Sequence, residues 1–353
     1  MDCIVQEKAI KTGISAATFL VLLVSIQSAQ CKDRAENLSA GGYYKNFFTV
    51  IDSPSFKDFP ETGTALIGAV NNRVRITASF SPVSWFFLET AWDFSPRVQD
   101  RSLFAAESFL PDPGGSTYRL ADFDERLYPD DEEKIHNVAV YHNLDRLATT
   151  FKPSFADVII GRQPVAWGSA RLINPIDIIA PFDFTALDRE DRTGVDACRI
   201  RIPVGMLSEI DAGYVFGVDA AFGKSAFFLK GALYVMQTDI TLLAAGFQEN
   251  LLVGFDLARA IGGAGAWCEA GYTLAGLLSD TPRTGTYDYF RISAGADYNF
   301  TRKIYGFAEY HFSSAGKADP EDYISFTITA DGPAQSMQDM VTLTMGPAYG
   351  EGT

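Results

Sequence analysis

Charged side chains occupy alternate positions in several apolar stretches of this chain. Arg199 and Arg201, for example, alternate with Cys198, Ile200 and Ile202. Successive side chains of a β-strand point to opposite faces, so the two arginines would share one face and the apolar residues the other. Fixed charges along a narrow, water-filled space can discriminate between ions and polar solutes, and this is the chemistry that the spacing predicts.

The same alternation assigns further ionisable side chains to a wet interior face. They are Arg75, Glu89, Asp93, Lys230, Asp256, Glu269, Arg291, Asp297 and Glu309. Two interpretations stay open. Either these charges pair across neighbouring strands and stiffen the interior, or they form separated basic and acidic walls that select solutes.

Catalytic residue patterns are absent from the sequence. The three histidines, His136, His142 and His311, belong to no His-Glu-x-x-His run, and the chain has no nucleophile elbow, Cys-x-x-Cys pair or phosphate-binding loop. We therefore predict no enzyme, no cofactor and no metal site. A serine–histidine pair that forms only in space, with His311 on an inward strand face, remains as the hydrolase alternative.

Predicted hairpins hold these charged positions. Between Tyr287 and Phe312, apolar and polar residues alternate on both sides of a turn at Thr301-Arg302. The strands run to about ten residues or more, close to what a tilted strand needs to cross a bilayer. The apolar face would then contact lipid and the charged face a wet lumen.

Short turns and long connections alternate along the chain. We expect short turns near 82–84, 153–155, 204–207, 237–238 and 262–263, and long connections near 96–142, 164–194, 217–225 and 276–286, with a strand at 118–123 inside the first of these. This order predicts an all-β fold, a transmembrane antiparallel up-and-down β-barrel of roughly 14–16 strands, with short periplasmic turns and long extracellular loops.

The N-terminus carries the pattern of a secretory signal peptide. Lys8 and Lys11 precede an uncharged run over 14–26, and small or polar residues follow up to Gln30. We expect a signal peptide at 1–30 and an outer-membrane barrel at 31–353. A lipid-modified Cys31 is the alternative.

Composition limits the class of protein and its partners. The 353 residues carry a net charge of −15, which argues against nucleic acid. The sequence lacks the run of roughly twenty apolar residues that a membrane helix requires, so a barrel is the one way left to span a bilayer. Outer-membrane lipid and small polar or charged solutes are the expected partners, and the oligomeric state stays open.

Cys198 and Cys268 lie five strands apart in the predicted meander, so we expect no disulfide.

The most distinctive run spans residues 161–177 and reads GRQPVAWGSARLINPID. The candidate functional residues of this region are Arg162, Gln163, Trp167, Gly168, Arg171, Asn174, Asp177, Asp188, Arg189 and Asp196. The region resembles a mostly uncharacterised group of Gram-negative outer-membrane barrels, porin-like, that carry Gly-Arg-Gln, Trp-Gly and Asn-Pro-x-Asp before Asp-Arg-Glu and Gly-Val-Asp-Ala. It is more loosely similar to alginate-export porins. The resemblance implies a fold and a compartment more firmly than a substrate.

Residues 164–194 are expected to form a long loop at the mouth of the lumen. Its prolines keep it out of the strand ladder, and its aromatic residues can bury apolar area. We expect an ion-pair network of Arg171, Asp177, Asp188 and Arg189, and a loop that only packs against the rim is the alternative. The expected function is a porin-like channel for diffusion or export of solutes; a structural or receptor barrel without an open pore is the alternative.

The end of the chain predicts an incomplete barrel. Counting strands places 323–329 inward and 340–345 outward, and the terminal residues include no closing aromatic strand end. We therefore expect the last strands of a complete barrel to be missing; a strand tracing that is off by one strand is the alternative.

Overall fold

Period-two alternation over long stretches produces strands almost throughout. The structure, a computed structural model, describes residues 20–22, 34–35, 37–52, 66–99, 118–121, 126–130, 134–181, 190–279, 287–316 and 339–346. The strands are β1 (Leu20–Leu22), β2 (Arg34–Ala35), β3 (Leu38–Asp52), β4 (Leu66–Val83), β5 (Phe86–Gln99), β6 (Arg126–Tyr128), β7 (Val138–Phe151), β8 (Asp157–Pro164), β9 (Gly194–Val204), β10 (Ser208–Val215), β11 (Ala226–Val235), β12 (Thr238–Phe247), β13 (Asn250–Ile261), β14 (Ala264–Leu274), β15 (Tyr289–Thr301), β16 (Ile304–Ser313) and β17 (Asp339–Gly346). Two 3-10 turns, η2 (Val218–Ala220) and η3 (Phe222–Lys224), lie between β10 and β11.

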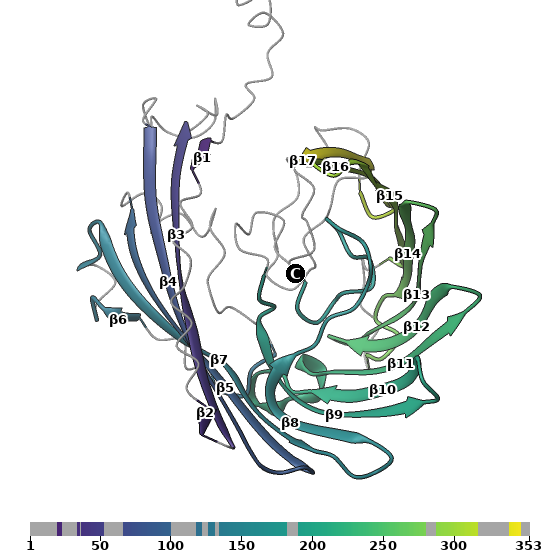
Figure 1. Ribbon diagram of the computed structural model, residues 1–353, viewed down its shortest axis with the longest axis horizontal. Helices are drawn as coiled ribbons and strands as arrows, with labels where there is room; N and C mark the ends of the chain where they lie inside the picture. Colours follow the sequence, from purple (N-terminus) through teal and green to yellow (C-terminus); the bar gives the residue numbers. More distant parts are fainter. Residues whose placement is uncertain are drawn as a thin grey trace, which may run out of the picture.

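The strands form one up-and-down meander. Leaving aside the short β1, β2 and β6, fourteen strands of the described chain pair antiparallel in sequence order from β3 to β17. The sheet curls around a central space, into which the β8–β9 connection folds (Figure 1). This confirms the predicted fold class and strand number.

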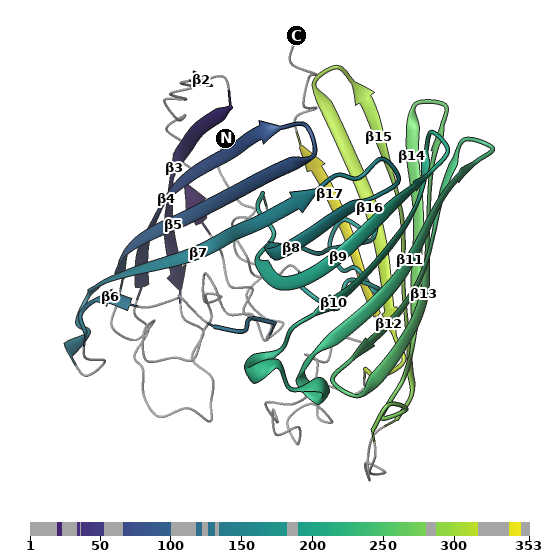
Figure 2. The ribbon, with the colours of Figure 1, turned by 90° about the horizontal axis from the view of Figure 1, so that it is seen from below.

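Short turns gather at one end of the sheet, as predicted. The hairpins β4–β5, β9–β10, β11–β12, β13–β14 and β15–β16 close at that end, which is uppermost in Figure 2. One further tight turn was not predicted: Gln248 and Glu249 join β12 to β13 at the opposite end, both with positive φ. The pair Gln-Glu lacks the glycine or asparagine that usually marks such a turn, so no residue pattern indicates the turn there.

The long connection between β5 and β7 differs from the prediction. Residues 118–121 are not a strand; Tyr118 and Arg119 are buried in the interior instead. The extra strand is β6, which adds to the edge of β7 over a few residues. The main meander is unaffected, because β5 pairs directly with β7.

The polarity of the sheet is inverted relative to a water-soluble protein. Large apolar side chains project outward, with Ile76 exposed over 62% of its surface; others are Trp92, Ile160, Leu229, Leu242 and Val253. Charged and polar side chains on the alternate positions are buried inside; they include Arg75, Asp93, Glu269, Glu309 and His311. An apolar outer face around a polar interior is the arrangement of a barrel in lipid. No helix in the described part of the chain is long and apolar enough to cross a membrane.

The two edges of the sheet correct one prediction. β17 pairs antiparallel with β16 and reaches Gly346 opposite Tyr305, so it runs toward the short turns. The predicted outward direction of 340–345 is therefore wrong, because β17 pairs antiparallel with β16, which runs away from the short turns. The strand-counting argument for missing strands fails with it. Within the described residues no register joins β17 to β3, whose other side carries β1 over Phe48–Val50. Completeness of the barrel, the signal peptide and the lipidation of Cys31 stay predictions, and residues 323–329 lie outside the described part.

Candidate functional site: a loop strapped across the interior

The connection between β8 and β9, residues 165–193, is called the strap below. Motif residues flank it on both sides, Gly-Arg-Gln on β8 and Gly-Val-Asp-Ala on β9. Arg162 on β8 donates from Nε and Nη2 to both carboxylate oxygens of Asp196 on β9, at 2.9 and 3.1 Å. Gln163 donates to the carbonyl of Ala197 at 3.2 Å. These contacts between two motif segments hold both ends of the strap to neighbouring strands.

Glu269 on β14 is the first anchor of the strap. Its side chain is fully buried and accepts hydrogen bonds from the backbone N–H groups of Ala170 and Ile176, at 3.1 and 2.9 Å, and from the amide of Asn174 at 3.2 Å. Gly168 has φ +93°, and a Cβ there would lie 2.2 Å from the carboxylate. Glycine at this position therefore lets the strap close over Glu269.

Glu309 on β16 is the second anchor. It accepts from the backbone N–H groups of Arg171 and Leu172 at 2.7 and 3.1 Å, and from the indole N–H of Trp267 at 2.9 Å. Asp256 on β13 accepts from the hydroxyl of Ser169. Acidic side chains of β13, β14 and β16 thus hold the strap mainly through its backbone and hydroxyl donors.

A serine and a histidine meet beside these anchors. Ser293 Oγ lies 2.8 Å from His311 Nδ1 and donates to the carbonyl of Ile173 at 2.7 Å, while Arg291 donates to the carbonyl of Pro175 at 2.8 Å. Both members of the pair are buried, and the histidine uses Nδ1 rather than the Nε2 that activates serine in the Ser-His-Asp template. The geometry fits a clamp on the strap better than a nucleophile.

Apolar packing adds to the polar anchors. Trp167 lies edge-to-face against Phe228 on β11, with ring centroids 4.7 Å apart. Val165 and Ile176 are fully buried in the same cluster. Burial of large apolar side chains fixes the first half of the strap against the β11–β14 wall.

The end of the strap, residues 190–193, lies against the opposite wall. Arg192 lies 2.5 Å from Asp177, an ion pair within the strap. Burial raises the pKa of Asp177 to about 7, although the Arg192 guanidinium opposes that shift. Asp191 contacts Arg73 and Arg75 on β4, so the strap joins two distant parts of the sheet.

Charged residues of the strands also pair with neighbouring strands. Arg199 binds Asp211 on the adjacent strand at 2.8 and 2.6 Å, Lys230 lies 3.0 Å from Glu209, and Arg201 lies 3.5 Å from Asp157. On the other wall Arg75 lies 3.2 Å from Asp93 and 2.6 Å from Asp145. These predicted lumen residues thus form ion pairs with residues of neighbouring strands.

The structure corrects the predicted ion-pair network of the strap. Arg171 pairs with Asp297 on β15 at 2.8 Å and lies over Trp267, whereas Asp177 pairs with Arg192. Asp188 and Arg189 lie outside the described residues. Glu89 is half-buried and has no ion pair among the described residues. The loop reaches into the interior, as expected, but Arg171 pairs with a strand residue and Asp177 with another residue of the strap.

Several polar residues of the barrel interior were not predicted. They are Tyr43, Lys45, Arg73, Asp145, Arg146, Glu209 and Asp211. Asp211 alternates with Ile210 and Ala212, so the period-two signal was present there. Asp145 lies at a register shift between β5 and β7, beside the buried Leu144 and the charged Arg146, so alternation did not mark it. Cys198 and Cys268 are free thiols, in agreement with the predicted absence of a disulfide between them.

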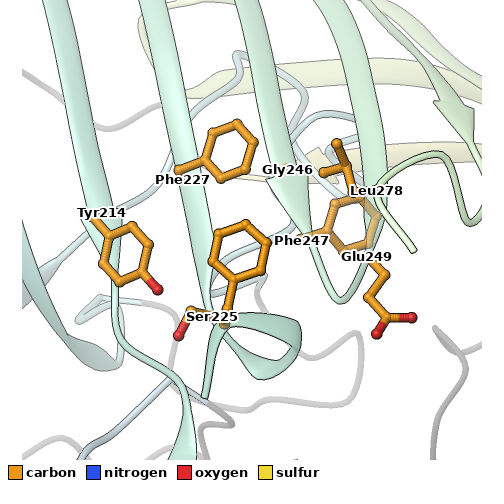
Figure 3. Close-up of a pocket in the computed structure, with 8 residues that line it drawn as sticks. Tyr214, Ser225, Phe227, Gly246, Phe247, Glu249 and Leu278 are labelled. Carbon is orange, nitrogen blue, oxygen red and sulfur yellow. The ribbon is translucent and has the colours of Figure 1, made fainter. Parts of the chain in front are cut away.

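A separate hollow lies at the long-connection end of β10–β13. It is lined by Tyr214, Phe222, Ser225, Phe227, Gly246, Phe247, Glu249 and Leu278 (Figure 3). A Cβ on Gly246 would lie 2.4 Å from the Phe227 ring, so this ring covers the strand backbone. Aromatic residues in this place are typical of the border between membrane and water.

An apolar outer face, a charged interior and short turns gathered at one end define an outer-membrane β-barrel of the Gram-negative type. No family model and no curated protein matches the chain. Among solved structures, it is similar to OccD3 (OpdP) of Pseudomonas aeruginosa, at 11% identity over 84% of this chain and 59% of that one, with a TM-score of 0.39. For OccK8 (OprE) of the same organism the identity is 8% over 78% and 68%, with a TM-score of 0.43.

OmpT, an outer membrane protein of Vibrio cholerae, is 11% identical over 84% of this chain and 89% of its own, with a TM-score of 0.31. The chain spans about 59% of the length of the OccD3 structure. At these values the likeness carries no argument about function.

Proposed function

We propose that the protein is an outer-membrane channel for small polar or charged solutes, narrowed by the strap. One observation carries the proposal: the strap is anchored on both walls of a polar interior, by Glu269 and Glu309 on one side and by Arg73 and Arg75 on the other. A segment held in that way narrows a pore without closing the barrel wall. Solutes that pass it meet fixed charges of both signs.

The polar interior supports solutes rather than lipids as cargo. Arg171 is exposed over 51% of its side chain, and Arg201 and Asp157 are also partly exposed. Lipid would contact the apolar outer face instead. We assign no catalytic step to this interior, because the Ser293–His311 pair is engaged by the strap.

A closed barrel that serves as a scaffold or receptor is the second candidate. It is favoured by the tight packing of the strap, where Val165 and Ile176 are fully buried. Such a barrel would block solutes and depend on a bound partner.

Liposome swelling distinguishes the two. Vesicles that contain the refolded full chain should swell in glycine and in small sugars, and the rate should fall steeply as the sugar grows, because the strap limits the opening. Swelling no faster than in protein-free vesicles, for protein that keeps its heat-modifiable band, would favour the closed barrel.

A further inference from the structure

Four donor side chains form a patch on the inner face of β3 and β4. Tyr43 and Lys45 on β3 lie opposite Arg75 and Arg73 on β4 in the strand register. Residues two apart on a strand share a face, and directly opposed residues are neighbours, so the four side chains surround one spot. We call these four residues the β3–β4 patch.

Carboxylates of the strap occupy this patch. The Tyr43 hydroxyl donates to Asp191, and Arg75 and Arg73 lie 3.6 and 3.9 Å from the same carboxylate. Lys45 lies 2.5 Å from Glu190. Two consecutive strap residues therefore place anions on all four members of the patch.

Strand carboxylates hold the two arginines in place. Asp93 lies 2.7 Å from Arg73 and 3.2 Å from Arg75, and Asp145 lies 2.6 Å from Arg75. Guanidinium groups fixed in this way lose little freedom when they bind a further anion, which makes them effective oxyanion donors.

The strap carboxylates are the most exposed of the charged side chains in the cluster. Asp191 is exposed over 25% and Glu190 over 71% of their side chains, whereas Arg75, Asp93 and Asp145 are almost completely buried. Burial opposes ionisation of Asp191, yet the hydrogen bond from Tyr43 and the charges of Arg75 and Arg73 lower its pKa overall. The surroundings therefore favour a negative charge at a position that water can reach.

We propose that the β3–β4 patch is a binding site for a small oxyanion, a carboxylate or a phosphate group, and that Asp191 and Glu190 occupy it as tethered competitors. An anionic solute displaces them and frees this end of the strap, while the anchors at Glu269 and Glu309 stay in place. The inference rests on the proposed channel for its place on a solute path. Binding to the patch does not require conduction.

Calorimetric titration of the detergent-solubilised full chain tests binding directly, with inorganic phosphate and acetate as probes. Asp191→Asn removes the competitor and keeps the shape, so at least one probe should bind about tenfold more tightly or better than to the wild type, the size expected for loss of one competing charge-assisted contact. Adding Arg73→Gln to Asp191→Asn should abolish that gain. Glu209→Gln, which neutralises a carboxylate paired with Lys230 on another wall, is the matched control and should behave as the wild type.

Equal affinity for both probes in the wild type, Asp191→Asn and Glu209→Gln would overturn the proposal. A gain in affinity in the Glu209→Gln control as large as in Asp191→Asn would overturn it too, because removal of any negative charge would then have the same effect. If Asp191→Asn loses the heat-modifiable band, Glu190→Gln carries the same test at Lys45. A wild type that does not conduct in bilayers would contradict the proposed channel and leave the calorimetric result standing.

Discussion

Two buried carboxylates, Glu269 and Glu309, bind backbone N–H groups of the strap rather than opposite charges. Glu269 is the clearest case, because it is the acceptor for two backbone N–H groups and one side-chain amide, all in a buried place. A buried donor that loses its acceptor costs about 1–3 kcal/mol. The strap should therefore depend strongly on this one residue.

Glu269→Ala should lower the free energy of unfolding by about 3 kcal/mol or more, because three donors lose their partner. Limited trypsin digestion should also cut the strap in the variant at protease levels that leave the wild type intact. Glu89→Ala is the control, since this half-buried carboxylate makes no contact with the strap in the described residues. Equal protease resistance of Glu269→Ala and the wild type would show that Glu269 does not anchor the strap.

Asp177 gives the strap a pH dependence of known sign. Burial raises its pKa to about 7, above the value of about 3.9 in an unfolded chain, so the folded protein binds this proton more tightly. The contribution of protonated Asp177 to the free energy of unfolding is complete below pH 4 and is lost as pH rises toward 7.

The midpoint of thermal unfolding should therefore fall between pH 4 and pH 7 more steeply in the wild type than in Asp177→Asn, which has no charge to gain. Buffers that differ only in pH, with Glu89→Gln as a variant that keeps Asp177, isolate this contribution. Parallel plots of the unfolding midpoint against pH for the wild type and Asp177→Asn over that range would contradict this role of Asp177.

At the scale of single residues, the sequence could name the strap residues but not their contacts. Trp167, Gly168 and Asn174 stood out because the motif is unusual. Glu269 lies 95 positions from Asn174 along the chain, and Phe228 lies 61 positions from Trp167. Which strand faces the strap depends on how the sheet curls. Alternation gave the inward direction of Glu269 correctly, but nothing in the sequence joins it to residue 170.

At the scale of elements, neighbouring strands decide what a charge does. Arg199 on β9 is held by both oxygens of the buried Asp211 on β10, whereas Arg201 has a longer contact with a partly exposed Asp157. The two arginines share a face but differ in their role.

Arg199→Glu should destabilise the barrel by about 3–5 kcal/mol, because it leaves two buried carboxylates side by side. Arg201→Glu should fold normally and move the reversal potential in a salt gradient toward cations, because its side chain is open to the interior. Folding is followed by the heat-modifiable gel band and selectivity in planar bilayers. A stable Arg199→Glu protein would contradict the expected destabilisation. An unchanged reversal potential of folded Arg201→Glu would contradict the expected change in selectivity.

The hairpins were predictable because each alternates over many residues and ends at a recognisable turn. The two misplaced elements have local causes. Gln248-Glu249 forms a tight turn without turn-forming residues. The direction of β17 follows from its pairing with β16, whereas the prediction counted a strand at 323–329 between the two. Pairing between distant strands is a property of the whole sheet, so one uncertain segment reverses everything after it.

At the scale of the whole molecule, the apolar outer face requires lipid. Ile76 lies near the middle of β4 and points outward. Ile76→Arg should reduce the stability in lipid vesicles by about 2–4 kcal/mol, the cost of a cation at the bilayer centre. Urea titration of the vesicle-inserted protein measures this, with Ile76→Leu as the control. An arginine variant as stable as the leucine variant would place this face in water.

The central claim is that the strap narrows a water-filled interior, and single-channel conductance in planar bilayers tests it most directly. In a variant with residues 168–176 replaced by a short glycine–serine linker, conductance should rise severalfold over the wild type. Selectivity should move toward cations, because Asp256, Glu269 and Glu309 lose their strap donors and face the lumen. Equal conductance of the folded wild type and the folded variant, or none from either, would contradict the account.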